Sequence, residues 1–253
     1  MNAVILAAGH GKRMRPFTDQ HHKSLLRFGG ETLLERHIRL LHAAGVGGVW
    51  VVAGHLAAQI EAALQQLPEP AAHIVYNNDF HLGNALSLLK AAEVLAAGPC
   101  LVIDADLLYD GRVLHAALAS KGAISVLTDP ALNDSGEEVK VVLNVGGSVC
   151  ELAKAVRSGG RIAGESLGIF RFGREAARAL ASRLPALIAA EPLLEVETAV
   201  TGLAADFDIR PVSVAGLPWV EIDFWDDVER ARNEIYPRLS DAAAGAQQAP
   251  ASS

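Results

Sequence analysis

The chain has 253 residues, of which 51% are hydrophobic, and a formal net charge of -7. This is enough apolar material for one large α/β domain or two small ones. The acidic balance argues against a nucleic-acid ligand, because wide contact with a phosphate backbone needs a clustered basic surface. The two cysteines, Cys100 and Cys150, each lie in an apolar run. We therefore expect no disulfide framework and a reducing compartment.

Neither a targeting signal nor a membrane span is expected. The opening apolar stretch, 3–8, is too short for the core of a signal peptide, and no run approaches the ~18 apolar residues that a span needs. These features predict a cytoplasmic protein without membrane contact, and they leave open whether it is a monomer or a homodimer. Residues 240–253, mostly Ala, Gln, Gly and Ser, predict a disordered tail.

Short β-rich runs alternate with helical patterns through the first half of the chain. Strands are expected at 3–7, 49–53, 73–76, 100–104 and 123–127, with helices at about 31–44, 56–66, 84–97 and 111–119. This alternation is typical of βαβ units. It predicts an α/β fold with a Rossmann-like, mixed but mostly parallel sheet and helices on both faces.

The pattern changes from about residue 134. Strand-like runs at 139–145, 148–153 and 164–172 are joined by turns, which predicts a small antiparallel patch beside the parallel sheet. A helical stretch at 174–204 should be interrupted near Pro185 and Pro192. Strands at 208–214 and 219–223 and a last helix at 224–235 follow. With no Pro- or Ser-rich linker, one continuous domain over 1–239 is favoured.

The first strand runs directly into a loop of glycines and basic residues, namely Gly9, Gly11, Lys12, Arg13 and Arg15. Open α/β sheets bind ligands at the carboxyl ends of their strands. Glycine lets main-chain amides approach phosphate oxygens, and arginine presents a fork of donors to them. The loop therefore predicts a triphosphate site, although alone it would also fit an ordinary surface turn. It matches neither the Walker pattern nor the three-glycine dinucleotide pattern.

Two pairs of carboxylates follow apolar strands. Asp104 and Asp106 end the strand at 100–104, and Glu221 and Asp223 precede the last helix with the same spacing. Residues two apart point to one face of an extended strand. Phosphoryl transfer between anions needs a divalent cation, and carboxylate oxygens are the ligands that Mg²⁺ prefers. A plain strand-to-turn boundary is the alternative for the first pair.

One long string of residues resembles the nucleotidyltransferase superfamily of sugar-phosphate pyrophosphorylases and phosphocholine-type cytidylyltransferases. It consists of Leu6, Ala7, Ala8, Gly9, Gly11, Arg13, Pro16, Thr18, Lys23, Leu25, Gly30 and 33–36. The resemblance implies that the glycine loop and Arg13 hold the phosphates of the nucleotide and that Lys23 reaches the reacting phosphates. Two departures are visible: His22 stands where the family often has proline, and Ala105 where it usually has glycine.

The resemblance also assigns the remaining site residues. It implies that Asp106 and Asp223 hold Mg²⁺ and that the catalytic residues are Lys23, Arg13, Asp106 and Asp223. The nucleotide-binding residues would be Leu6, Ala7, Ala8, Gly9, Gly11, Lys12, Arg13, Lys23, Asn84, Ser87 and Asp104. The acceptor-binding residues would be Lys140, Lys154, Glu165 and Glu221. Taken alone, Asn84 and Ser87 fit helix capping equally well, and each acceptor residue also fits a solvated charge.

The resemblance implies transfer of CMP from CTP to a small phosphorylated alcohol or phosphonate, phosphocholine-like, with release of pyrophosphate. The alternatives are a hexose-1-phosphate nucleotidyltransferase using UTP, dTTP or GTP, and a non-catalytic relative that binds nucleotide and regulates a partner. Trp219, Trp225 and Tyr109 could form an aromatic cage for a quaternary ammonium group, although core or rim positions are the commoner use of such residues. His21 and His22 are expected on a mobile loop, and the nine histidines show no zinc pattern.

Overall fold

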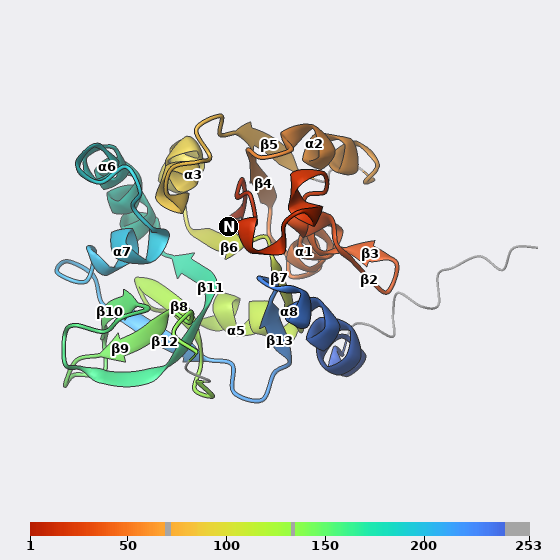
Figure 1. Ribbon diagram of the computed structural model, residues 1–253. Helices are drawn as coiled ribbons and strands as arrows, with labels where there is room; N and C mark the ends of the chain where they lie inside the picture. Colours follow the sequence, from red (N-terminus) through yellow and green to blue (C-terminus); the bar gives the residue numbers. More distant parts are fainter. Residues whose placement is uncertain (69–71, 133–134, 241–253) are drawn as a thin grey trace, which may run out of the picture.

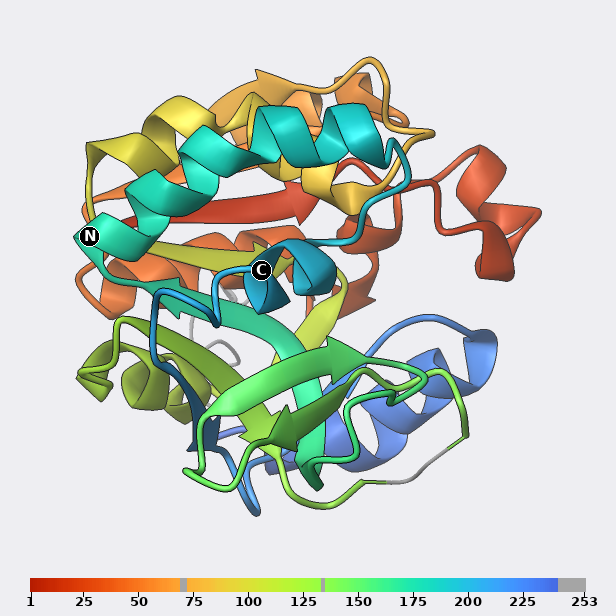
Figure 2. The same ribbon diagram turned by 90° about the vertical axis from the view of Figure 1, so that its left-hand side faces the viewer.

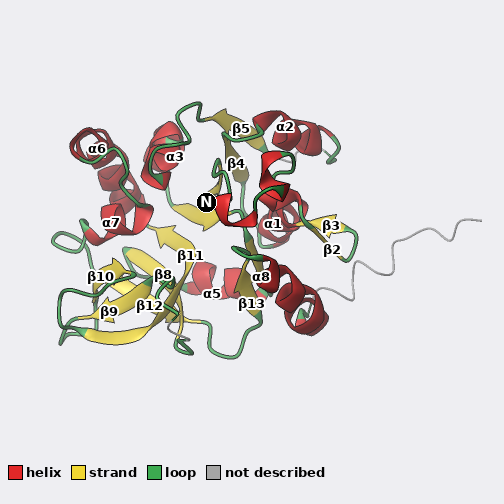
Figure 3. Ribbon diagram, viewed as in Figure 1, coloured by secondary structure: helices red, strands yellow, loops and turns green. Residues whose placement is uncertain are grey.

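The computed structural model describes residues 1–68, 72–132 and 135–240. Its centre is a nine-stranded mixed sheet, visible as the yellow layer in Figure 3. The strands are β1 (Asn2–Ala7), β4 (Gly48–Ala53), β5 (His73–Tyr76), β6 (Cys100–Asp104), β8 (Ile124–Asp129), β9 (Lys140–Leu143), β10 (Val149–Ala153), β11 (Arg161–Phe172) and β12 (Ile209–Ser213). The main path runs β10-β9-β11-β6-β1-β4-β5, and β8 joins β12 to β11.

The first half of the chain builds the parallel part of the sheet. Strand β1 lies between β4 and β6 and is parallel to both, and β5 continues in parallel beyond β4. Ala3, Val4 and Ile5 are each fully buried. A strand covered on both faces reads as a continuous apolar run rather than an alternating one. The parallel core expected from the sequence is confirmed.

Strand β11 joins the parallel part to an antiparallel patch. Its last residues pair with β6, its first residues pair with β9, and β8 pairs with it at two places. The register shifts twice, and Gly164 and Gly168 lie next to these shifts with φ of 150° and 70°. Bulges of this kind bend a strand, which lets one strand serve both regions. The antiparallel patch is confirmed.

Helices cover both faces of the sheet (Figure 1). One face carries α1 (Leu33–Ala43), α2 (Ala57–Gln65) and α5 (Arg112–Ala119), and the other carries α3 (Asn84–Lys90), α4 (Ala92–Ala97), α6 (Arg174–Ala190) and α7 (Val196–Thr201). Figure 2 shows α6 and α7 from the side on which they lie. Helix α1 begins with a capping box between Thr32 and Glu35. No helix in the described part of the chain is long and apolar enough to span a bilayer.

Two helix predictions are wrong in detail. Helix α6 continues through Pro185, where an interruption was expected, and ends at Ala190, so that only the interruption expected near Pro192 is confirmed. Pro185 lies on the exposed side of α6, where water can satisfy the carbonyl that proline leaves without a partner. The expected helix at 84–97 is divided into α3 and α4 at Ala91.

A third layer packs the end of the chain against its beginning. Strand β13 (Trp219–Glu221) pairs with β7 (Leu107–Tyr109), and α8 (Trp225–Arg230) continues into a π-helical turn, Ala231–Ile235. A short hairpin of β2 (Arg27–Phe28) and β3 (Glu31–Thr32) adjoins them. Buried Met14 and Leu26 pack against Val228 and Ile235 in this layer. The proposed domain bounds of 1–239 stay a prediction, and the tail from residue 241 lies outside the described residues.

Candidate active site

The glycine loop leaves the carboxyl end of β1, in the middle of the parallel strands. Gly11 has φ of 65°, a left-handed conformation that glycine adopts without strain. A Cβ at Gly11 would also lie 3.1 Å from Thr18 Cγ2, and the Thr18 hydroxyl donates to the Gly11 carbonyl at 2.9 Å. The loop is thereby fixed with Arg13 beyond the strand end, in a single 3-10 turn, Lys12–Met14.

Lys23 lies at the centre of the candidate site. It begins a second short turn, Lys23–Leu25, and its Nζ lies 2.6 Å from Asp106 Oδ2 and 3.0 Å from Asp223 Oδ1. Only 11% of its side chain is exposed. Burial alone would lower the pKa of the Lys23 ammonium, but the charges of Asp106 and Asp223 outweigh burial and raise it. Lys23 is therefore a fixed positive charge between two carboxylates.

His22 holds this turn in place, which corrects the expectation of a mobile loop. Its side chain is buried, and its Nδ1 accepts a hydrogen bond from the Ser24 amide at 3.2 Å. Burial lowers the pKa of the His22 imidazole to about 4. A neutral His22 accepts this bond, and its ring caps the turn. His21 is exposed and stacks on Phe17.

Arg13 adds a second positive charge to the same carboxylates. Its Nη1 donates to Asp223 Oδ2 at 2.7 Å, and its Nη2 donates to Glu137 Oε2 at 2.6 Å. The guanidinium also stacks over the Phe224 ring at 5.5 Å. Burial would raise the pKa of Asp223, but Lys23 and Arg13 lower it below the usual value. Asp223 therefore stays ionised.

The chain topology brings the two carboxylate pairs together. Glu221 ends β13, which is antiparallel to β7, and Asp223 follows it; between them the Ile222 amide donates to the Asp106 carbonyl at 3.0 Å. Oxygens of Asp106, Glu221 and Asp223 lie within 4.8 Å of one another, and this is the only such acidic or histidine group in the described residues. Asp106 Oδ1 is buried and has no hydrogen-bond partner. Such an oxygen-rich group with an unused buried oxygen fits a hard divalent cation.

Glu221 and Asp104 both have raised pKa values. Burial raises the pKa of Glu221 to about 8, with further contributions from the charges of Asp106 and Asp223. Burial, then the charge of Asp106, raises the pKa of Asp104 well above its usual value. Strand β6 ends at Asp104 and the chain turns at Ala105, so Asp104 and Asp106 do not share one extended strand as the sequence suggested. Binding of a metal cation here would be favoured, because its positive charge would reduce the repulsion among these carboxylates.

A cavity of about 910 Å³ lies over these strand ends. Its first part is lined by Leu6, Ala8, Gly9, Arg13, Asn84, Ser87, Asp104 and Asp106, all of them predicted site residues. Gly11, Lys12 and Lys23 line an adjoining cavity of about 340 Å³, to which Arg13 and Asp223 also contribute. The side chain of Ala7 packs in the core, so only the main chain of Ala7 could contact a nucleotide.

The predicted acceptor residues divide among different places. Lys154 and Glu221 line the main cavity, and Glu165 lines a neighbouring one of about 370 Å³. Lys140 lines none of these three cavities: it is buried, and its Nζ donates to the Lys154 carbonyl at 2.8 Å. The placement of Lys140 among the acceptor residues stays a prediction. Its ammonium fixes the end of β10.

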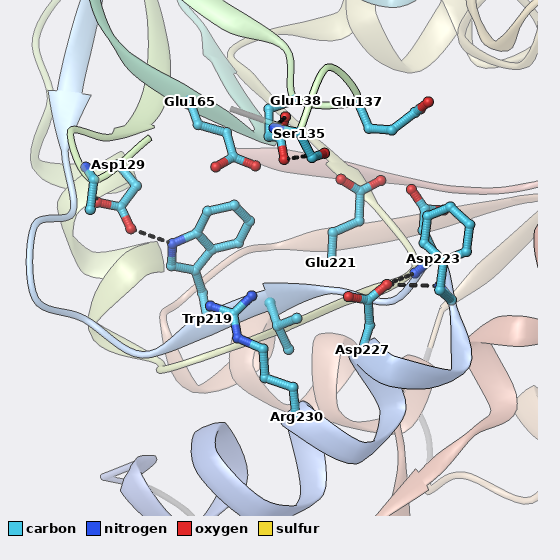
Figure 4. Close-up of a pocket in the computed structure, with 13 residues that line it drawn as sticks. Asp129, Ser135, Glu137, Glu138, Glu165, Trp219, Glu221, Asp223, Asp227 and Arg230 are labelled. Atoms are coloured by element: carbon cyan, nitrogen blue, oxygen red, sulfur yellow. Dashed lines mark hydrogen bonds between the residues drawn. The ribbon is translucent and has the colours of Figure 1, made fainter. Parts of the chain in front are cut away.

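The neighbouring cavity is acidic and has one aromatic wall (Figure 4). The Glu165 carboxylate lies next to the Trp219 ring, whose Nε1 donates to Asp129 at 2.7 Å, and the Asp227 carboxylate is turned toward the main chain at Asp223. Burial, then the charges of Glu138 and Asp129, raises the pKa of Glu165 to about 7. Of the three residues suggested for an aromatic cage, Trp219 lines this cavity. Tyr109 is buried in the core, and Trp225 packs on Phe17.

Several cavity residues were missed by the sequence analysis. Glu137 accepts from Arg13 and, at 3.0 Å, from Lys154, so it connects the glycine loop to the antiparallel patch. Glu195 and Glu197 line the far end of the main cavity. Glu195 is the N-cap residue of α7 and Glu197 lies in its first turn, so the local signal was a pair of acidic residues two positions apart.

Comparison with known proteins places this arrangement in a family. Over 238 residues, 93% of the chain is 30% identical to the bifunctional IPC transferase and DIPP synthase of Rubrobacter xylanophilus. Over 148 residues it is 28% identical to the choline-phosphate cytidylyltransferase of Haemophilus influenzae, with 56% of the chain covered. The chain spans 52% and 62% of the length of these two relatives.

The fold also matches solved structures. The inositol-1-phosphate CTP transferase from T. maritima superposes with a TM-score of 0.79 over 96% of both chains, at 20% identity. A family model matches residues 3–162, which include the glycine loop, Lys23 and Asp106. The chain belongs to the family defined by the MobA-like NTP transferase domain.

Proposed function

We propose that this protein transfers CMP from CTP to a small phosphorylated alcohol or a phosphonate and releases pyrophosphate. The observation that carries the proposal is the position of Lys23, held between Asp106 and Asp223 with Arg13 beside it. Two cations from the first 23 residues meet two carboxylates, one from the middle of the chain and one from its last part, at the carboxyl ends of parallel strands. This is the charge arrangement that a reacting polyphosphate and its counter-ion need.

In the proposed reaction an oxygen of the acceptor phosphate or phosphonate attacks the α-phosphorus of CTP. The bond from the α-phosphorus to its bridging oxygen breaks, and pyrophosphate leaves with that electron pair. The acceptor is already anionic, so no side chain is required to remove a proton. Lys23 and Arg13 would neutralise charge on the phosphates, and the glycine loop would bind them through main-chain amides.

Asp106 and Asp223 would hold Mg²⁺, with Glu221 close enough to join them. When bound, the ion would reduce repulsion between the two anionic substrates and stabilise the leaving pyrophosphate. The role of the chain is to orient the ion's ligands. The Asp227 carboxylate contributes by accepting from the Asp223 amide at 2.9 Å and from the Phe224 amide at 2.7 Å.

The preference for CTP rests on what the relatives' names say of those proteins. Uridylyltransferases also occur among the relatives, for example the N-acetylmuramate alpha-1-phosphate uridylyltransferase of Neisseria meningitidis. The far end of the main cavity, with Glu195, Glu197 and Thr198, accepts hydrogen bonds and would suit hydroxyl groups of the acceptor. A sugar 1-phosphate is therefore the second candidate for the acceptor.

Pyrophosphate release tests the proposal. Each of CTP, UTP, dTTP and GTP is paired with phosphocholine, 2-aminoethylphosphonate, inositol 1-phosphate and glucose 1-phosphate in the presence of Mg²⁺. We expect CTP with one of the first three acceptors to give the fastest release. Fastest release with glucose 1-phosphate would favour the second candidate, and release with none would favour a non-catalytic nucleotide-binding protein.

Two variants make the same assay specific for the carboxylates. A double Asp106→Ala and Asp223→Ala variant should lose activity. Asp226→Ala, which removes an exposed carboxylate beside the site, should keep it. Full turnover by the double variant would refute the metal assignment.

A further inference from the structure

Helix α7 forms a wall of the main cavity at the end away from the glycine loop. Glu195, Glu197, Thr198 and Thr201, on or next to this helix, line the cavity. On one side α7 is attached to the antiparallel patch, because the Leu152 amide donates to Thr201 Oγ1 at 3.1 Å. Leu152 lies on β10, two residues before Lys154. This side of α7 is therefore fixed to β10, next to the predicted acceptor residue Lys154.

On its other side α7 is attached to the nucleotide end of the cavity. The Val196 amide, at the first position of α7, donates to Asn84 Oδ1 at 2.7 Å. Two main-chain bonds accompany this contact: the Gly83 amide donates to the Pro192 carbonyl at 3.1 Å, and the Ala85 amide donates to the Leu194 carbonyl at 3.2 Å.

The two segments are in such close contact that no side chain would fit between them. A Cβ at Gly83 would lie 2.1 Å from the Leu194 carbonyl oxygen. The start of α3 and residues 192–196 therefore move as one unit unless these bonds break. Helix α3 carries Asn84 and Ser87 on the nucleotide side, and residues 195–197 carry Glu195 and Glu197 on the acceptor side.

This contact changes the interpretation of Asn84. The first amides of a helix have no partner within the helix. Here the side-chain oxygen of Asn84 is the partner of one of them, the Val196 amide. The side-chain oxygen that could have read a nucleobase is used to hold α7. We propose that Asn84 is a positioning residue that couples the two substrate sites, so that nucleotide bound against α3 orders the acceptor wall on α7. The inference rests on the proposed function.

The same hydrogen bond can be removed from either end. Asn84→Ala removes the acceptor oxygen, and Val196→Pro removes the donor amide at a helix position where proline is well tolerated. Only the first variant changes a side chain that lines the cavity. We expect each variant to raise the KM for the acceptor about ten-fold, with the KM for CTP changed less than about two-fold. The double variant should be no worse than either single variant, because both remove one bond.

Asn84→Asp is the conservative variant, because it keeps an oxygen at the same position. It should restore the acceptor KM to within about three-fold of the wild-type value. Phosphocholine and inositol 1-phosphate serve as the probe acceptors. A role in reading the base gives a different result: the KM for CTP would rise in Asn84→Ala but not in Val196→Pro, and this would overturn the proposal.

Hydrogen exchange in the presence of CTP and Mg²⁺ tests the coupling without an acceptor. In the wild type, CTP should slow exchange both in the glycine loop and in α7. In Asn84→Ala and Val196→Pro the protection of the loop should remain and that of α7 should be lost. Ser182→Ala, on the exposed side of α6, is the matched control and should behave as the wild type.

The two proposals fail in different ways in this experiment. Equal protection of α7 in the wild type and in Asn84→Ala would overturn the coupling and leave the proposed function standing. No protection of the glycine loop in the wild type would overturn the proposed function, and the coupling with it. Thermal unfolding shows whether each variant folds. If one of the two does not fold, the other, which removes the same hydrogen bond from its other end, carries the test.

Discussion

Replacing Lys23 by methionine tests the electrostatics of the site through stability, before any substrate is known. The ammonium neutralises Asp106 and Asp223, and the exposed fractions of the three side chains are 11%, 21% and 26%. Surface ion pairs contribute up to about 1 kcal/mol, and removing one partner of a buried pair costs about 3–5 kcal/mol. For this partly buried pair of contacts we expect Lys23→Met to lower the free energy of unfolding by about 2–3 kcal/mol.

For a protein of this size that loss corresponds to a Tm lower by about 4–12 °C. The assay is thermal unfolding at pH 8, first with EDTA and then with saturating Mg²⁺. We expect the gap between Lys23→Met and the wild type to narrow when Mg²⁺ is present, because the ion binds the carboxylates that the ammonium has left. Lys121→Met, which removes an exposed lysine from a loop, is the matched control and should shift the Tm by less than about 1 °C. A Tm for Lys23→Met equal to that of the wild type in EDTA, or a gap that Mg²⁺ leaves unchanged, would refute the reasoning.

Three further predictions follow from the same contacts. Asp106→Asn or Asp223→Asn should each lower kcat by at least about 100-fold and abolish the Mg²⁺-induced rise in Tm, and a variant that keeps both would contradict the metal assignment. The folded state binds fewer protons on His22 than the unfolded state between pH 6.5 and 4, so the free energy of unfolding should fall as pH falls through this window. Over the whole window His22 contributes up to about 3 kcal/mol to this fall, and urea titrations of His22→Gln should show a smaller dependence of the free energy of unfolding on pH. Gly168→Ala should destabilise the protein by more than about 1 kcal/mol in the same titrations, because Gly168 has φ of 70° and a Cβ would lie 2.2 Å from Asp104 Oδ2.

The parts of the fold and site that could be predicted from the sequence depend on local pattern. The run that forms β1 is apolar without interruption and ends at glycines, and both features follow from burial between two parallel neighbours and from the loop that follows. The same holds for β6 and the carboxylates after it. Bringing Asp106 and Asp223 together required the family resemblance, because the two follow separate strands, β6 and β13, and no local pattern relates them.

What the sequence could not give depends on register and on long-range contacts. Lys140 looks like a surface charge, yet β9 has strands on both sides and buries all four of its residues, so the ammonium donates to a carbonyl instead of facing the cavity. His22 reads as part of a polar loop, and only the packing of the loop shows that it is buried. The amide side chain of Asn84 suits reading a nucleobase. Its actual partner, the Val196 amide, is 112 positions away along the chain, where no local pattern could indicate it.

The charge balance of the site indicates how its ligands would bind. Lys23 and Arg13 are both paired with carboxylates of the chain itself, and Lys154 is paired with Glu137. A triphosphate that takes these cations would leave Asp106 and Asp223 without partners, in a region where Glu221 and Asp104 already have raised pKa values because of burial and neighbouring charge. A divalent cation that takes the carboxylates would likewise release the lysine and the arginine. The nucleotide would supply the negative charge that the cations lose, and the metal ion would supply the positive charge that the carboxylates lose. The electrostatics therefore favour binding of nucleotide and cation together over binding of either one alone.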